Sequence, residues 1–304
     1  MGFTVQSLNL INQISHDLRD SSILSLGNPF LSDHVLNLSN ISYIYKKNIK
    51  SIDRNNRAKY LFEQVFASSK FSILDISDEE CADVIWDLNV PISSSTSNCK
   101  YDYVLDFGTQ EHVFDNKRFL ENAFQLLRVG GSYIFVLPSN GEIDHGFRQY
   151  SPTFFYDLCA ANIHHLSVEH LALCSKNFSL NVLPMYERMD HMSSSVIGRT
   201  HFYEGLSEDN GIFTGTSIGL INRLNFPISL LGVIRKIKEG KLNFIVSQCL
   251  YRNNTLGQVL PDPNKGLFNM KSLFVSVSKK IALNFPLPAA LKLHIFSFLA
   301  SRRN

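Results

Sequence analysis

Apolar residues across positions 1–175 follow two patterns. Short apolar runs between turn-forming residues predict buried strands, and apolar residues three and four positions apart predict amphipathic helices. By these rules we expect strands at 22–26, 71–76, 82–88, 103–107, 133–137 and 167–174. We expect helices at 1–20, 54–68, 116–127 and 151–161, with a turn at Gly130-Gly131 between a helix and the strand that follows it.

The alternation of strands and helices predicts an α/β fold, namely a Rossmann-like, doubly wound, mostly parallel sheet with helices on both faces. Right-handed crossovers place the carboxyl ends of the strands at one edge of the sheet, where ligands bind. Several polar residues end or follow predicted strands and are expected to meet at this edge: Asn28, Asp75, Asp87 and Glu111.

The second half of the chain is less regular. We interpret residues 175–240, with their Met, Ser and Gly residues, as an insertion or lid. Residues 243–251, NFIVSQCLY, are a strong strand candidate that returns to the sheet as a hairpin partner. The predicted core therefore comprises residues 1–174 and 241–252.

Residues 253–304 form a basic, apolar carboxyl-terminal extension in which no acidic residue follows Asp262. Helices packed onto the core are the commoner structure for such a segment. The alternative is peripheral contact of residues 265–304 with an anionic membrane, through their basic charge and their Phe and Leu side chains.

Composition narrows the possible classes of protein. The chain has 304 residues, 44% of them apolar, which is enough for one large domain or for a domain with an extension. A net charge of +2 gives no general attraction to nucleic acid, so no nucleic-acid partner is expected. No CxxC pair occurs among the five cysteines and no metal site is expected. The amino terminus lacks a signal-peptide pattern, and a cytoplasmic location is the simplest expectation.

Four motifs occur in a fixed order: LDxSD from Leu74, ADxxxDLNxP from Ala82, GTxEHV from Gly108 and HGFxQxSPxxFYD from His145. Together they resemble a mostly bacterial group of class I S-adenosylmethionine (SAM) methyltransferases. The resemblance covers roughly residues 20–175. Each motif is weak alone, and the specific signal is their joint occurrence in this order.

The resemblance implies that SAM is the cofactor and that its site lies at the predicted edge. It assigns the loop at Gly27 to close backbone approach, Asp75 to the ribose hydroxyls and Asp87 to the adenine amino group. The other cofactor-binding residues that it implies are Ser77, Leu88, Gly108 and Glu111. The alternatives are structural: Gly27 ends a strand, Asp75 is a turn residue or a helix cap, and Asp87 forms a turn with Asn89.

Two polar loops carry the candidate catalytic residues, His112 and His145. A histidine has a pKa near neutrality and is therefore a suitable base for an acceptor that must lose a proton. His145, Arg148 and Tyr150 are the candidate substrate-binding residues, with Arg148 suited to an anionic group. The alternatives are that the Glu111-His112 pair shapes the cofactor pocket, and that the His145 loop is held by hydrogen bonds before the helix at Pro152.

These observations favour a SAM-dependent methyltransferase (EC 2.1.1 class) that acts by in-line displacement on a small-molecule or sugar-containing acceptor. The alternative is a catalytically degenerate methyltransferase fold that serves as a binding or interaction module, because the first loop, LSLGNPF, has a single glycine. The chain has neither GxGxxG after its first strand nor GxxxxGK[ST], which argues against NAD and P-loop enzymes.

Overall fold

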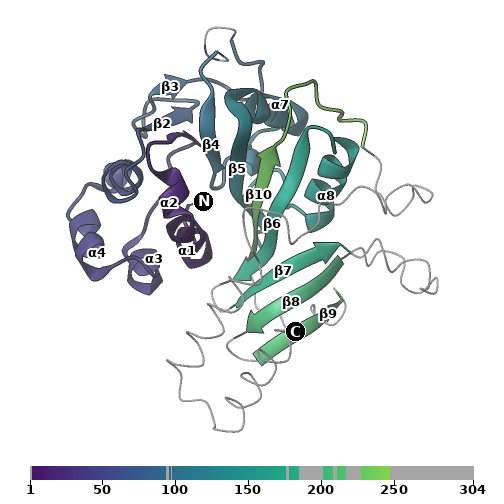
Figure 1. Cartoon of the computed structure of the whole chain (residues 1–304). Helices are drawn as coiled ribbons and strands as arrows, with labels where there is room; N and C mark the ends of the chain where they lie inside the picture. Colours follow the sequence, from purple (N-terminus) through teal and green to yellow (C-terminus); the bar gives the residue numbers. More distant parts are fainter. Residues whose placement is uncertain are drawn as a thin grey trace. The chain divides into compact units, whose positions relative to one another are not determined.

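A computed structural model describes residues 2–93, 96, 98–175, 178–184, 201–207, 211–216 and 227–246 (Figure 1). These residues belong to a compact unit, Met1–Leu260. They build one sheet whose ten described strands follow the order β3-β2-β1-β4-β5-β10-β6-β7-β8-β9. The bounds are β1 Ser22–Leu26, β2 Lys70–Asp75, β3 Val84–Ile85, β4 Tyr101–Asp106, β5 Leu127–Asn140, β6 Leu166–Ser175, β7 Phe178–Pro184, β8 His201–Ser207, β9 Gly211–Thr216 and β10 Ile228–Lys236.

The first five strands are parallel and follow the order β3-β2-β1-β4-β5, in which neighbouring strands are joined by crossovers. Strand β10 lies antiparallel between β5 and β6, and β7 to β9 continue the sheet as an antiparallel meander. A reversal of strand order at β1 and β4 creates the switch point at which such sheets bind ligands. The predicted Rossmann-like α/β fold is confirmed.

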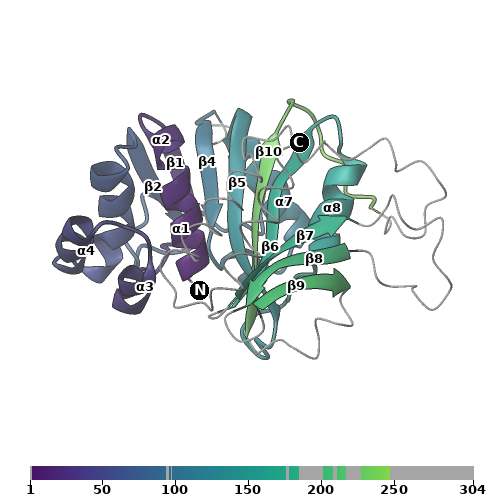
Figure 2. The ribbon, with the colours of Figure 1, turned by 60° about the horizontal axis from the view of Figure 1, so that its bottom comes forward.

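Helices cover both faces of the parallel part of the sheet (Figure 2). The described helical segments are α1 Val5–Gln13, α2 Ser15–Leu18, α3 Asp33–Leu38, α4 Tyr43–Lys50, η1 Arg54–Asn56, α5 Arg57–Tyr60, η2 Leu61–Val65, η3 Gln110–His112, α7 Asn116–Leu126 and α8 Pro152–Ala161. Helices α7 and α8 pack Phe119, Phe124 and Phe155 onto a core cluster that contains Leu24 and Phe135 from the sheet. Helix α1 lies on the other face (Figure 2).

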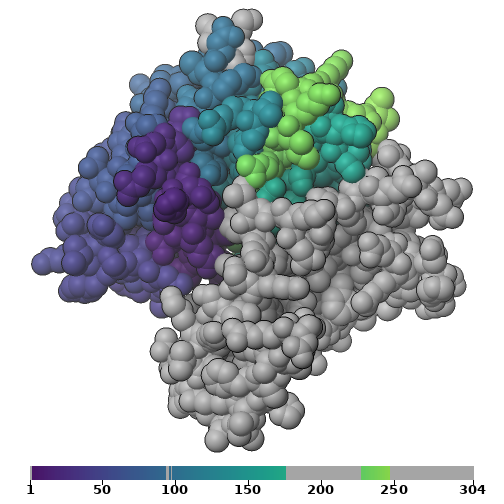
Figure 3. All heavy atoms as spheres, viewed as in Figure 1, coloured from purple at the N-terminus to yellow at the C-terminus, as the bar shows by residue number. Residues whose placement is uncertain are grey.

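The first helix forms for the reasons that the sequence suggests. Thr4 caps α1 in a reciprocal capping box with Ser7. The predicted apolar face, Leu8, Ile11, Ile14 and Leu18, is buried, although the helix is interrupted at Ile14 and continues as α2. On the face of the molecule seen in Figure 3, these amino-terminal residues (purple) and residues 227–246 (green) both reach the surface.

The Gly130-Gly131 pair lies inside β5 and not in a turn before it. The pairing of β4 with β5 shifts there, from Tyr101 opposite Leu127 to Tyr103 opposite Ser132. Gly130 has a φ of +83°, and a Cβ on Gly131 would lie 2.6 Å from the carbonyl oxygen of Asp102. Both positions therefore require glycine, and the expected turn is a bulge in a continuous strand.

The strand expected at 243–251 is the main error in the predicted topology. Residues 243–246 form no strand, and residues 247–251 lie outside the described part of the chain. The strand that pairs with β5 and β6 is β10, inside the segment interpreted as an insertion. Gly232 of β10 lies directly beneath the ring of Phe135, where a Cβ would be 2.1 Å from Cζ. This fit depends on a residue distant in sequence, so local periodicity does not reveal it.

Other expectations for the second half are tested less fully. The basic extension 253–304 lies outside the described residues, and the proposed domain boundaries remain a prediction. Among the helices that the structure describes, none combines the length and the apolar character needed to cross a membrane.

Candidate functional site

Three strands of the parallel sheet end side by side at the predicted edge. Leu26 at the end of β1 pairs with Leu74 of β2 on one side and with Asp106 of β4 on the other. The next residue, Gly27, turns with a φ of +76° and donates its N–H to the carbonyl of Leu74 at 2.8 Å. A Cβ on Gly27 would lie 2.5 Å from Thr109 Oγ1 and 3.8 Å from Asp75 Oδ2. The first loop, the end of β2 and the loop after β4 therefore meet around Gly27.

The residues expected to bind ribose and adenine lie along β2 and β3. Asp75 is half-buried at the end of β2, and its Oδ1 accepts a hydrogen bond from the N–H of Ile76. Asp87 Oδ1 accepts hydrogen bonds from both the N–H and the side-chain amide of Asn89, as in the alternative turn interpretation. Ser77 is half-buried, and Leu88 belongs to the core cluster. Cofactor contacts of these residues remain a prediction.

A buried carboxyl group, Asp106, organises the loop after β4. Its Oδ1 accepts hydrogen bonds from the N–H groups of Thr109 and Gln110, and its Oδ2 accepts one from the hydroxyl of Tyr133 at 2.7 Å. Burial raises the pKa of Asp106 to about 6, against the effect of these hydrogen bonds. Between Asp106 and Thr109, the chain passes through buried Gly108, which has a φ of +102°. Sequence reasoning missed Asp106, although an Asp just before a Gly-Thr loop is a known turn signal.

Tyr150 belongs to the same buried network. Its hydroxyl group donates to Asn116 Oδ1 at 2.9 Å, and the side-chain amide of Gln110 donates to the same oxygen at 2.6 Å. With its side chain buried, Tyr150 has the structural role that was the alternative to substrate binding.

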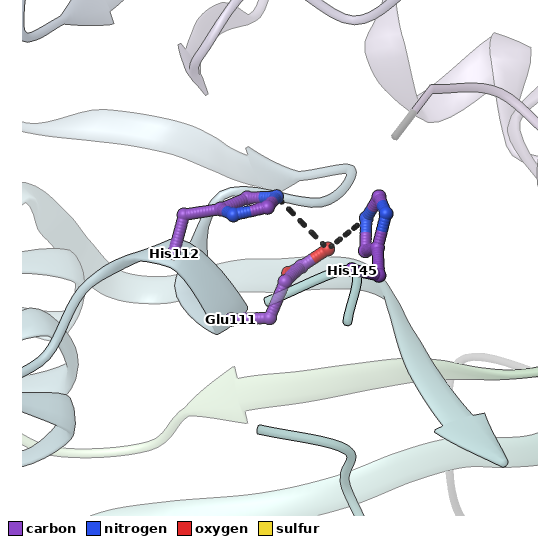
Figure 4. A group of neighbouring side chains, drawn as sticks. All are labelled: Glu111, His112 and His145. Carbon is purple, nitrogen blue, oxygen red and sulfur yellow. Dashed lines mark ion pairs between the residues drawn. The ribbon is translucent and has the colours of Figure 1, made fainter. Parts of the chain in front are cut away.

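The loops after β4 and β5 bring Glu111, His112 and His145 together (Figure 4). Glu111 is fully buried, and neither of its carboxylate oxygens has a hydrogen-bond partner among the described residues. Its Oε1 lies 3.5 Å from Nε2 of His145 and 4.0 Å from Nε2 of His112. Burial, together with the charge of Asp106, raises the pKa of Glu111 to about 8. The two candidate catalytic histidines thus share one carboxyl group, which the sequence did not indicate.

The electrostatics of the histidines follow from this arrangement. Burial, and then the charge of His145, lowers the pKa of His112 below its ordinary value. The imidazole of His112 is therefore neutral at pH 7 and able to accept a proton. The two imidazole rings lie 5.0 Å apart, and both side chains are partly exposed, 46% for His112 and 31% for His145.

Close packing holds the His145 loop against Glu111. A Cβ on Gly146 would lie 2.9 Å from Glu111 Cγ, and the N–H of Phe147 donates to the carbonyl of Glu111. The guanidinium of Arg148 donates to the carbonyls of Val113 and Phe114. Arg148 therefore ties the two loops together, as in the alternative interpretation, and binding of an anionic substrate by Arg148 remains a prediction.

An exposed aromatic pair flanks the two loops. Phe114 and Phe147 form an edge-to-face contact with ring centroids 5.5 Å apart, and their side chains are 70% and 63% exposed. Sequence reasoning gave these residues no role. Their signal in the sequence is a Phe directly after each polar motif.

A cavity of about 430 Å³ lies elsewhere, between the start of α7 and α8. Its lining contains Asn116, which also belongs to the buried network, and Asp157. None of the predicted cofactor-binding residues lines it.

Comparison with known proteins gives a consistent picture of the fold. No family model matches the chain, and no curated protein does. Among solved structures, the chain is similar to the N-methyltransferase NodS from Bradyrhizobium japonicum (10% identity, 77% of this chain and 96% of that chain, TM-score 0.39). It is also similar to 1,6-didemethyltoxoflavin-N1-methyltransferase from Burkholderia thailandensis with bound S-adenosylhomocysteine (11%, 77% and 78%, 0.33).

A third similar structure is the O-methyltransferase of a Brevibacillus brevis trans-AT polyketide synthase in complex with S-adenosylhomocysteine (10%, 77% and 72%, 0.40). All three proteins are methyltransferases. At these TM-scores the similarity carries no argument about the activity of this chain, which has to come from its site.

Proposed function

We propose that this chain binds SAM at the carboxyl ends of β1, β2 and β4 and transfers its methyl group to a small-molecule or sugar-containing acceptor. The observation that carries the proposal is the meeting of Gly27 with Asp75 and Thr109 at the switch point of the sheet.

The residues at this edge fit the cofactor. Gly27 has the left-handed backbone that glycine adopts without strain, and it leaves its outer face free of a side chain. Asp75 places a half-buried carboxylate beside it, and a carboxylate at the end of the second strand accepts hydrogen bonds from ribose hydroxyls. Asp87 and Leu88 follow β3, the next strand outward, where the adenine is expected.

SAM supplies a methyl group on a sulfonium centre, which leaves by in-line displacement. The task of the protein is to orient an acceptor against that centre and to exclude competing water. His112 and His145 are the residues that we assign to the acceptor side, because they lie on loops at the same edge. A hydroxyl acceptor loses its proton during the reaction, and a neutral imidazole is a suitable base for it.

The acceptor class follows from what surrounds the histidines. The exposed Phe114 and Phe147 rings offer an apolar surface next to polar groups. Such a mixture suits a molecule with both an apolar face and hydroxyl groups, such as a sugar or a hydroxylated ring.

A second candidate function is a SAM-fold binding module without turnover. The first loop favours it: the side-chain amide of Asn28 donates to the carbonyls of Asn55 and Glu80 at 2.9 Å each, so this loop is tied across the edge in place of a glycine-rich turn. Binding of SAM without methyl transfer to a broad panel of hydroxylated acceptors would favour this candidate.

The test is calorimetric titration of the full chain with S-adenosylhomocysteine. We expect Asp75→Ala to weaken binding at least about tenfold, the effect of losing roughly one charge-assisted hydrogen bond. Asp78→Ala is the matched control, because Asp78 is an exposed acidic residue of the same motif and should leave binding within about twofold. Folded protein that does not bind, or equal losses in both variants, would contradict the proposal.

A further inference from the structure

We propose that Glu111, His112 and His145 form a binding site for a divalent first-row transition metal. The sequence alone predicted no metal site, because the three residues have no recognisable ligand spacing. The fold brings them together, with one ligand atom from each residue within 4.8 Å of the others.

The distances between the ligand atoms suit one shared ion. Two ligands about 2.1 Å from a tetrahedral metal are roughly 3.4 Å apart. The distance from Glu111 Oε1 to His145 Nε2 is 3.5 Å, and that to His112 Nε2 is 4.0 Å. A small rotation of the partly exposed His112 ring therefore completes the set.

The carboxylate gives the second, independent observation. Glu111 is fully buried, and neither Oε1 nor Oε2 receives a hydrogen bond from the described residues; the same holds for Nε2 of His145. Buried charges are costly unless they are paired or coordinate a metal. All three unpartnered atoms belong to the proposed site, and Oε1 of Glu111 faces both imidazole rings (Figure 4).

The surrounding structure holds the carboxylate in place. The backbone of Glu111 is fixed by the N–H of Phe147 and by contact with Gly146. The residue before it, Gln110, is anchored through Asn116 and Asp106. A rigid ligand between two more exposed histidines is the arrangement that supporting residues give to metal ligands.

The donor set defines the kind of ion. Two imidazole nitrogens and one carboxylate oxygen suit zinc, manganese, iron or cobalt better than magnesium or calcium, which prefer oxygen ligands throughout. Three protein ligands leave at least one coordination position, and both histidines are partly exposed. On the basis of the proposed function, we assign the free position to a hydroxyl oxygen of the acceptor, because the site lies on the loops that carry the candidate acceptor-side residues.

The experiment uses the full chain, stripped of metal with a chelator and titrated with Co²⁺ while visible absorption and heat are recorded. We expect one Co²⁺ per chain, with bands typical of nitrogen and oxygen ligands. Loss of a ligand in Glu111→Gln or His145→Ala should weaken binding at least about 100-fold. His164→Ala, which removes an exposed histidine elsewhere, is the matched control and should bind like the intact chain.

Several results would overturn this site: no stoichiometric binding by the folded chain, unchanged binding by folded Glu111→Gln, or a sulfur charge-transfer band from exposed Cys81 or Cys99. Absence of Co²⁺ binding would leave Glu111 and His145 as a pair that shares a proton. Titration of the same samples with S-adenosylhomocysteine separates the two proposals. Co²⁺ binding without S-adenosylhomocysteine binding would contradict the proposed function and leave the metal site standing.

Discussion

The backbone N–H of Phe147 donates a hydrogen bond to the carbonyl oxygen of Glu111 at 2.8 Å. This single bond joins the loop after β5 to the loop after β4. It places His145, two residues before Phe147, next to the buried Glu111 carboxylate. The two polar motifs that are separate in the sequence therefore act as one structural unit.

Gly146 tests whether that unit depends on close packing. An alanine Cβ would lie 2.9 Å from Glu111 Cγ and 3.0 Å from its carbonyl oxygen, so Gly146→Ala should push the loops apart. We expect a loss of about 1–2 kcal/mol in the free energy of unfolding, measured by urea denaturation, with weaker Co²⁺ binding. Gln149→Ala changes an exposed neighbour in the same loop and serves as the control; equal effects of the two substitutions would argue against this packing.

Asp106 and Tyr133 should be energetically coupled. Asp106→Asn replaces an acceptor oxygen with a donor inside a fully buried network, and we expect a loss of about 2 kcal/mol. Tyr133→Phe removes one hydrogen bond and leaves the carboxyl less satisfied, with a similar loss. In a double-mutant cycle followed by urea denaturation, the double variant should lose less stability than the sum of the single variants. Additive losses would show that the bond contributes little.

The fit of β10 under Phe135 explains why that strand contains a glycine. Gly232→Ala would place a Cβ 2.1 Å from Phe135 Cζ, and we expect a loss of about 3 kcal/mol in stability. Phe135→Leu removes the far end of the ring, so Gly232→Ala should be less destabilising in that background. Thermal unfolding of the four proteins checks this. An equally large loss in the Phe135→Leu background would mean that the backbone of β10, and not the ring, requires glycine.

His170 should make stability depend on pH. Burial in β6 lowers its pKa to about 4, whereas an unfolded chain has a histidine pKa near 6.5. Between these values the unfolded chain binds more protons, so this residue reduces stability progressively as the pH falls from about 7 to 4. The chain should therefore lose about 2–3 kcal/mol more than His170→Leu over that range.

The raised pKa of Asp106 acts in the opposite direction, because the folded chain holds that proton up to about pH 6. Comparison with His170→Leu cancels this contribution, since both proteins contain Asp106. Urea denaturation at several pH values is the measurement. Parallel stability curves for the two proteins would contradict the assignment to His170.

Local patterns were sufficient to predict the elements of the first half. The runs SILSL and FSILD are bounded by turn residues and are buried strands, and Ser151-Pro152 begins α8 as expected. Parallel strands end at one edge, and this general rule was enough to bring Gly27 and Asp75 together. These predictions depended on neighbours in the sequence or on topology.

The features that were missed depend on contacts between distant residues. Strand β10 is defined by its fit against Phe135, and helices α3 and α4 lie in a stretch for which no element was predicted. The burial of Asp106 and Glu111 is also a tertiary property, since both residues are polar and follow a strand as surface residues often do. The shared carboxyl of Glu111 between two histidines was for this reason unpredictable from spacing.

The most direct test of the central claim is a crystal structure of the chain with S-adenosylhomocysteine bound. The account predicts the ribose hydroxyls within hydrogen-bonding distance of the Asp75 carboxylate and the ligand lying across Gly27. S-adenosylhomocysteine in the cavity between α7 and α8, or at any place that leaves Asp75 and Gly27 without contact, would contradict it.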